Sequence, residues 1–130
     1  MIVENRHDYI DYRFKRAIES YDEALILFAN KHWNTVVNRL YNSCFYAVIA
    51  VLLKNNIETD THDGVRTQFG LKFVKPGLID KKYGKLFSKL FDYRQKGDYG
   101  DLYDFDEITV TPLINQVKVF IAELERIIKE

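Results

Sequence analysis

The chain contains little of what would mark a specialised class of protein. Its 130 residues include a single cysteine, Cys44, so an internal disulfide is impossible and a reducing compartment is compatible with the composition. With 6 glycines and 2 prolines, it shows neither an internal repeat nor a low-complexity linker. Its longest apolar run, near residues 45–53, is too short to span a bilayer, and its start lacks an apolar signal core. We therefore expect a cytoplasmic protein with no membrane association.

An excess of charge of one sign is also missing. Lysine and arginine total 19, aspartate and glutamate total 19, and the formal net charge is zero. No global positive field therefore attracts nucleic acid, although a local basic patch stays possible. The hydrophobic (47%) and charged (29%) fractions are those of an ordered globular protein, and the length favours one domain over residues 1–130. Nine tyrosines and nine phenylalanines favour a core built from large rings.

Helical periodicity runs through the whole chain. Apolar residues recur at steps of three and four, and no stretch shows the alternation of a strand. The sequence therefore predicts an all-α, up-and-down bundle of four long helices and one short helix. Thr61 and Asp80 are the expected N-caps of the short helix and of the long helix that follows it. The other expected long helices run from about residue 8 to 29, from about 33 to 54, and, after an acidic loop over 97–106, from Thr109 or Thr111 onward with Pro112 in the first turn.

The helix expected over residues 33–54 differs from the others because its second half is apolar on more than one face. Such a pattern is typical of the most buried helix of a bundle. We expect this helix to lie at the centre, with four side chains of its middle part largely buried. These four are Tyr41, Cys44, Phe45 and Val48.

The most informative segment covers residues 91–101, where the fourth long helix should end. Arg94 continues the apolar stripe of that helix, so its guanidinium would lie at the edge of a buried face, where an unpaired charge is costly. Asp98 follows four residues later and falls beside Arg94 on a helix, with Tyr99 next to it. The three residues therefore form either a structural ion pair with aromatic packing or a binding site. In the second case the planar guanidinium of Arg94 would hold a phosphate.

Four motifs, in order along nearly the whole chain, resemble the HEPN domain family. Residues 38–47 are similar to its Arg-Tyr-Tyr-small-Phe-aromatic pattern, and residues 61–65 resemble the Thr-His-x-Gly turn of one bacterial and archaeal branch. Residues 69–77 and the Arg-x-x-x-Asp-Tyr spacing that begins at Arg94 match the same branch. The resemblance implies a helical bundle that usually dimerises. It also implies one of two roles, a metal-independent ribonuclease or the partner of a small nucleotidyltransferase in a toxin–antitoxin system.

The chain departs from the catalytic pattern of that family. The resemblance implies Arg-x-x-x-x-His at the end of this helix, whereas Asp98 and Tyr99 follow Arg94 here and no histidine occurs after His62. Metal-free cleavage of RNA needs a proton acceptor and a proton donor near neutral pH, and imidazole serves as both. The neighbouring Arg94 would favour the charged form of Asp98 and make it a weak base, and a phenol titrates far above pH 7.

We therefore predict an RNA- or nucleotide-associated module that is non-catalytic or weakly catalytic and has a minimal nucleotidyltransferase as its partner. We expect a homodimer with the end of the fourth long helix near its two-fold axis. A ribonuclease toxin with a modified active site and a pure protein-interaction module are the alternatives. No cofactor is expected, and no metal either, since the acidic loop lacks the spacing of a calcium site.

Further candidates for the site lie on other segments. Asn38 and Arg39 are either a buried polar pair or part of the site, and His62 is either a local hydrogen-bonding residue or an imidazole that reaches the cleft. A basic strip of Lys81, Lys82, Lys85 and Lys89 leads toward Arg94, although such a strip is usually a solvated face. The predicted RNA- or nucleotide-binding residues are Arg94, Asp98, Tyr99, Asn38, Arg39 and His62, of which the first three are also the candidates for catalysis.

Overall fold

The computed structural model describes residues 6–59, 61–100 and 103–130. These residues form five α-helices and one short π-helical segment, and they contain no strand. The predicted all-α bundle of four long helices and one short helix is confirmed. In chain order the elements are α1 (Arg6–Ala29), α2 (Trp33–Lys54), α3 (His62–Phe69), η2 (Gly70–Val74), α4 (Lys81–Tyr99) and α5 (Glu107–Lys129).

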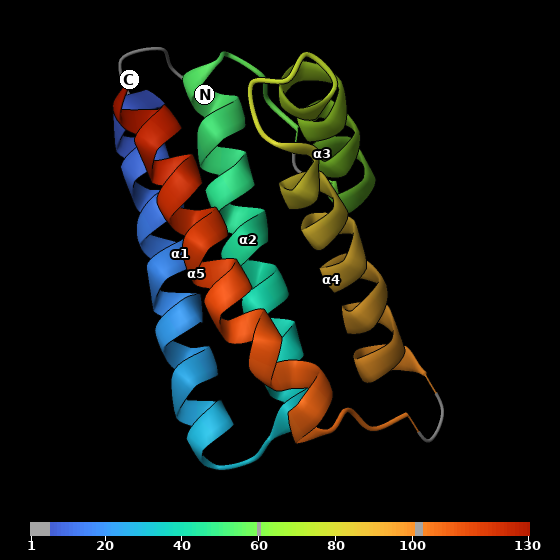
Figure 1. Cartoon of the computed structure of the whole chain (residues 1–130). Coiled ribbons are helices and arrows are strands. Elements are labelled where there is room, and N and C mark those ends of the chain that lie inside the picture. Colours follow the sequence, from blue (N-terminus) through green and yellow to red (C-terminus); the bar gives the residue numbers. More distant parts are fainter. Residues whose placement is uncertain (1–5, 60, 101–102) are drawn as a thin grey trace.

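The second helix lies at the centre of the bundle, as its apolar pattern predicts. α1 and α5 pack on one side of α2, and α3 and α4 pack on the other (Figure 1). Tyr41, Cys44, Phe45 and Val48 are each at most 9% exposed, which confirms the expected core. By length and composition α2 would be able to cross a membrane, but 78% of its apolar window is buried inside the bundle. That burial is typical of a core helix.

Small side chains let α1 run close along α2. Ala17, Ser20 and Ala24 lie at successive turns of α1 and are fully buried. The hydroxyl of Ser43 on α2 donates a hydrogen bond to the carbonyl oxygen of Ala17 at 2.7 Å. The close packing also brings Glu23 of α1 within 3.3 Å of Arg39 on α2.

The two predicted N-caps are confirmed. Oγ1 of Thr61 accepts the N–H of Gly64 at 3.0 Å, and Oδ1 of Asp80 accepts the N–H of Lys82 at 2.9 Å. Glycine is favoured at position 64 because a Cβ there would clash with Oγ1 of Thr59 and lie 2.7 Å from Oγ1 of the capping Thr61. The Thr-His-x-Gly turn therefore has a steric cause, and it starts α3 with His62 as the first helical residue.

The end of α4 lies further along the chain than expected. The sequence predicts a loop from Gly97 onward, but the helix continues through Gly97 to Tyr99. The difference matters for the site, because Asp98 stays helical and keeps its position one turn after Arg94. The chain is also already helical at Arg6, the first residue that the structure describes, ahead of the expected start near residue 8.

The start of α5 was also predicted wrongly. The cap is Asp106, whose carboxylate accepts the N–H of Thr109 at 2.8 Å, so the helix begins at Glu107 and not at Thr109 or Thr111. Pro112 consequently lies inside the helix, beyond the first turn. Asp106, Thr109 and Thr111 can each cap a helix, and Asp106, the first of these along the chain, is the cap.

Candidate functional site

A polar cluster forms where α4 ends beside the first half of α2. Nδ2 of Asn38 donates to Oδ2 of Asp98 at 2.7 Å, and Nε of Arg94 lies 3.4 Å from the same oxygen. The predicted pair of Arg94 and Asp98 is therefore present, with side chains 17% and 24% exposed. Asn38 joins it across 60 residues of sequence because α2 and α4 pack together.

Arg94 is held against aromatic rings and is incompletely bonded. Its guanidinium carbon lies 5.4 Å from the centre of the Tyr41 ring and 5.9 Å from that of Tyr99. Its Nε is buried and makes no hydrogen bond to any described residue, so the contact with Asp98 is a long ion pair. Tyr99 is 69% exposed, which opens this end of the cluster to solvent. Such a guanidinium favours an anion as an additional partner.

The predicted polar pair of Asn38 and Arg39 belongs to the same cluster. Oδ1 of Asn38 accepts hydrogen bonds from Nε and Nη2 of Arg39 at 3.0 and 2.6 Å, and from Nδ2 of Asn42 at 3.3 Å. Nη1 of Arg39 also lies 3.3 Å from a carboxylate oxygen of Glu23 on α1. Arg39 is therefore paired with Asn38 on its own helix and with Glu23 on α1.

His62 enters the cluster from α3. Its Nδ1 lies 2.9 Å from the hydroxyl oxygen of Tyr41, and its ring packs with the centre 4.5 Å from that of Phe45. The ring of His62 thus bonds to a residue of another helix, and that residue, Tyr41, also lies under Arg94. The sequence does not predict the contact between His62 and Tyr41, because it depends on how α3 packs against α2.

Burial and charge shift the titration of these two residues. Burial, then the positive charge of Arg94, lowers the pKa of His62 below 6.5, and the negative charge of Asp63 opposes this change. Burial raises the pKa of Tyr41 above its ordinary value, although Arg94 and Arg66 act in the opposite direction. Near neutral pH the imidazole is therefore uncharged and the phenol keeps its proton.

Asn34 is a structural residue of the site that sequence reasoning missed. Its Oδ1 accepts the N–H of Phe105 at 2.8 Å, and its Nδ2 donates to the carbonyl oxygens of Tyr103 at 2.9 Å and of Gly97 at 3.4 Å. These bonds tie the end of α4 and the chain after it to α2. The spacing of Asn34, Asn38 and Asn42 along one face of α2 is the signal that would have identified it.

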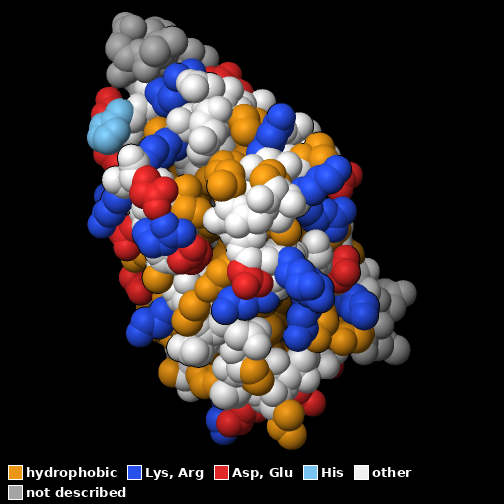
Figure 2. Space-filling view, turned by 45° about the horizontal axis from the view of Figure 1, so that its top comes forward, with side chains coloured by type: hydrophobic (Ala, Val, Ile, Leu, Met, Phe, Trp, Pro, Cys, Tyr) orange, Lys and Arg blue, Asp and Glu red, His pale blue; other side chains and the backbone are white. Residues whose placement is uncertain are grey.

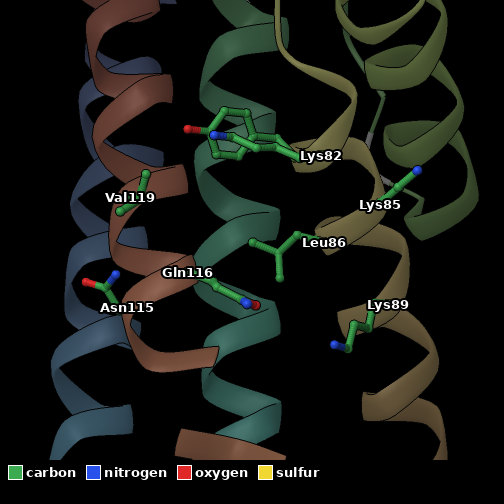
Figure 3. A pocket seen from close by; sticks show the side chains of 8 residues that line it. Lys82, Lys85, Leu86, Lys89, Asn115, Gln116 and Val119 are labelled. Atoms are coloured by element: carbon green, nitrogen blue, oxygen red, sulfur yellow. The ribbon is translucent and has the colours of Figure 1, made fainter. Parts of the chain in front are cut away.

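The predicted basic strip on α4 divides between two grooves. Lys82 lines a groove of about 370 Å³ between α4 and α5, opposite Asn115 and Gln116. Lys81 instead lines a groove of about 570 Å³ toward α3 and η2, and Lys85 and Lys89 border both. Figure 3 shows Leu86 pointing between α4 and α5 while Lys85 points toward α3.

Charge on the surface is mixed in sign. Figure 2 shows lysine and arginine side chains interspersed with aspartate and glutamate over one face, as the zero net charge predicts. Lys82, Lys85 and Lys89 make no ion pair with a described carboxylate in spite of that mixture, so they remain local cations on the helix that carries Arg94. Within the described residues, no group of three or more histidine, cysteine, aspartate or glutamate side chains is arranged to hold a metal ion.

Comparisons with known proteins show the family of the chain. A family model for the HEPN domain matches residues 10–127. The chain is 36% identical over 121 residues to a UPF0332 protein of Thermotoga maritima, covering 93% of the chain and 92% of that relative. It is 33% identical over 114 residues to "Putative toxin MJ0605" of Methanocaldococcus jannaschii, covering 88% and 84%. A second protein of that organism, "Putative toxin MJ0142", is 25% identical over 125 residues, covering 90% and 85%. The chain thus belongs to the HEPN domain family.

Proposed function

We propose that this chain is a toxin-like HEPN module that binds RNA through Arg94 and works with a minimal nucleotidyltransferase in a toxin–antitoxin pair. The observation that carries the proposal is the incomplete hydrogen bonding of the Arg94 guanidinium. Its side chain is 17% exposed, its guanidinium lies against two phenol rings, and its Nε makes no hydrogen bond to a described residue. The printed names of two relatives support the toxin-like role.

A phosphodiester is the ligand that this guanidinium suits. Its N–H groups form a planar fork that matches two phosphate oxygens. Asp98, its present partner, lies 3.4 Å from Nε and is held separately by Asn38 at 2.7 Å. Asp98 therefore keeps a hydrogen bond when a phosphate engages Arg94. Lys85 and Lys89 on the same helix add local attraction for a polyanion, which the neutral chain as a whole does not provide.

We propose further that hydrolysis of RNA by this chain is absent or slow, since no histidine follows Arg94 along α4. The ribonuclease toxin remains the second candidate, and the observation that favours it is the imidazole of His62 beside Tyr41. Growth arrest on expression that Arg94→Ala relieves would support this second candidate. Expression without any effect on growth or on RNA integrity would count against it.

Assembly is the third part of the proposal. Large apolar side chains are exposed around the end of α4 and the start of α5: Tyr99 by 69%, Tyr103 by 39% and Ile108 by 84%. Such a surface suits a homodimer with the end of α4 near its two-fold axis, where two copies of Arg94 would approach each other. Light scattering of wild type and Ile108→Lys tests this: we expect a dimer that the variant weakens. A monomeric wild type from micromolar to near-millimolar concentration would refute the dimer.

The central experiment compares Arg94→Ala with Arg126→Ala. Both variants lose one positive charge, but Arg126 is an exposed residue of α5 that pairs with Glu123 and Glu130. If Arg94 holds a phosphate, Arg94→Ala should weaken binding of single-stranded RNA by roughly tenfold or more. It should also reduce the slope of log K against log salt by about 1. Arg126→Ala should leave the affinity close to that of wild type.

Thermal melts separate the structural reading of Arg94 from the binding one. We expect Arg94→Ala to melt within a few degrees of wild type. A large melting shift with unchanged RNA binding would assign Arg94 to the fold and leave the pure interaction module as the function. Co-purification with a nucleotidyltransferase encoded beside this gene tests the partnership, and failure of the two co-expressed proteins to associate would remove that part of the proposal.

A further inference from the structure

The fold supplies an imidazole beside the Arg94 cluster although none follows Arg94 in the sequence. We infer that His62 accepts the proton of the ribose 2′-hydroxyl in a slow cleavage of RNA held by Arg94. The inference rests on the proposed RNA-binding function and adds a catalytic residue to it. The supporting observation is the position of His62 on α3, which is bonded to Tyr41 of α2, the residue that also contacts Arg94 of α4.

Tyr41 connects His62 to Arg94. Nδ1 of His62 lies 2.9 Å from the hydroxyl oxygen of Tyr41, and the centres of the two rings are 5.7 Å apart. The guanidinium carbon of Arg94 lies 5.4 Å from the centre of the same phenol ring. The imidazole of α3 and the guanidinium of α4 therefore both contact one residue of α2. The inference places the ribose of a nucleotide held by Arg94 beside this imidazole.

The bond to Tyr41 determines which nitrogen of His62 can react. Nδ1 is engaged by the hydroxyl, so Nε2 is the nitrogen available to a substrate. When Nδ1–H donates to the hydroxyl oxygen, Nε2 carries a free lone pair, which is the form that a proton acceptor needs. Tyr41 itself stays protonated because burial raises its pKa. The phenol thus orients the imidazole without exchanging a proton with it.

The charged and titratable groups around His62 favour the neutral imidazole. Arg94 faces it from α4 and Tyr41 from α2, while Asp63 and Arg66 belong to α3 itself. The positive charge of Arg94 and burial act together to lower the pKa of His62, and they outweigh Asp63. A neutral imidazole near pH 7 is ready to accept a proton, whereas a protonated one would not be.

The proposed step is an internal transesterification. Nε2 of His62 takes the proton of the 2′-hydroxyl while the 2′-oxygen forms a bond to phosphorus and the bond from phosphorus to the 5′-oxygen breaks. Water donates a proton to the leaving 5′-oxygen, and the resulting hydroxide takes the proton back from the imidazolium. The products are a 2′,3′-cyclic phosphate and a 5′-hydroxyl. Arg94 balances the charge that develops on the phosphate oxygens.

A structural role for His62 predicts different results, so the variant must keep its contacts. His62→Asn serves this purpose, because an asparagine amide can occupy the place of Nδ1 and bond to Tyr41 but cannot accept a proton near pH 7. His32→Asn is the matched control, since His32 lies at the exposed start of α2 and makes no side-chain capping bond there. Thermal melts and RNA-binding titrations of both variants report on fold and binding separately from cleavage.

The test measures single-turnover cleavage of a labelled single-stranded RNA by the purified full chain, with a 2′-O-methyl copy of that RNA as the blank. We expect slow cleavage by wild type and by His32→Asn, and a loss of roughly 100-fold or more in His62→Asn. The melting temperature and RNA affinity of His62→Asn should stay near those of wild type. The wild-type rate should rise with pH and level off below pH 6.5, as the lowered pKa of His62 requires.

Other outcomes contradict the inference. Equal cleavage by wild type and His62→Asn, or no cleavage by wild type at all, would overturn the role of His62 while Arg94-dependent RNA binding keeps the proposed function intact. Absence of RNA binding would instead overturn the proposed function, and this inference with it. A His62→Asn variant that loses cleavage, stability and RNA binding together would assign His62 to the fold.

Discussion

The two halves of α2 are continuous in sequence but contact very different surroundings. The first half carries Asn34, Asn38, Arg39 and Asn42, whose amides and guanidinium bond to one another, to α1, to the end of α4 and to the chain after α4. The second half, over residues 44–53, is apolar except for the partly exposed Tyr46, which makes it the core of the bundle. The first half thus positions the polar groups of the candidate site, and the second half forms the apolar core against which the other helices pack.

The difference separates the residues that stabilise the fold from those that form the candidate site. Burial of large apolar side chains contributes about 1.5–3 kcal/mol each, whereas a hydrogen bond contributes a net of about 0.5–1.5 kcal/mol. Tyr41 stands at the boundary and belongs to both halves. Its ring stacks on Phe87 in the core, with centres 5.7 Å apart, and its hydroxyl meets His62. Packing in the apolar core therefore holds Tyr41 in place, and the hydroxyl of Tyr41 contacts the polar cluster.

A core substitution in the second half should have the largest effect on stability. Leu52 is 1% exposed, so Leu52→Ala would leave a cavity among α2 and its neighbours. We expect the free energy of unfolding to fall by about 2–5 kcal/mol, measured by urea denaturation with an unchanged m-value. Ile26→Ala on α1 is the control, because Ile26 is 64% exposed and its loss should change stability by about 0.5 kcal/mol or less.

A polar substitution in the first half should have an intermediate effect. Asn34→Ala removes the partners of the Phe105 N–H and of the Tyr103 carbonyl, and we expect a loss of about 1–2 kcal/mol in the same urea experiment. Amide hydrogen exchange at Phe105 should become faster. Asn115→Ala is the control, since Asn115 is exposed on α5. If Asn34→Ala cost as much as Leu52→Ala, the contrast between the two halves would be wrong.

Most of the fold could be predicted because its signals are local. The periodic apolar residues predict the five α-helices of the described chain, and Thr61 and Asp80 cap the two helices for which the sequence predicts them as caps. The end of α4 is harder to predict, because Gly97 indicates a break in the helix and yet lies within it. Glycine weakens a helix by roughly 1 kcal/mol, which tertiary bonds such as that from Asn34 to the Gly97 carbonyl can outweigh.

The candidate site could be predicted only in part. Arg94 and Asp98 are four residues apart on one helix, so their pairing follows from spacing alone. Asn38 and Asp98 are 60 residues apart in the sequence, and Tyr41 and His62 are 21 apart. Their contacts depend on which faces of the helices pack together, and residue spacing does not show this. The turn at η2, where the N–H of Lys75 bonds to the carbonyl oxygen of Gly70, left no signal in the apolar pattern.

The smallest expected effect is a pH dependence of stability that arises from His62. Its pKa in the folded chain lies below the 6.5 of an unperturbed imidazole. The unfolded state therefore binds more protons between these two values, so the free energy of unfolding should decrease as the pH falls from 6.5 through the folded pKa, and the loss should be complete below it. Urea unfolding of wild type, His62→Asn and His32→Asn at several pH values from about 5 to 8 measures it.

We expect His62→Asn to flatten the curve in this window and His32→Asn to keep it, because only the imidazole of His62 is in contact with Tyr41. Arg94→Ala sharpens the test, since the loss of its positive charge should raise the pKa of His62, as an NMR titration of the imidazole would show directly. A pKa of His62 that does not respond to Arg94→Ala would mean that the two groups do not share one site. In that case the candidate site would consist of Arg94, Asp98 and the polar residues of α2, and His62 would not belong to it.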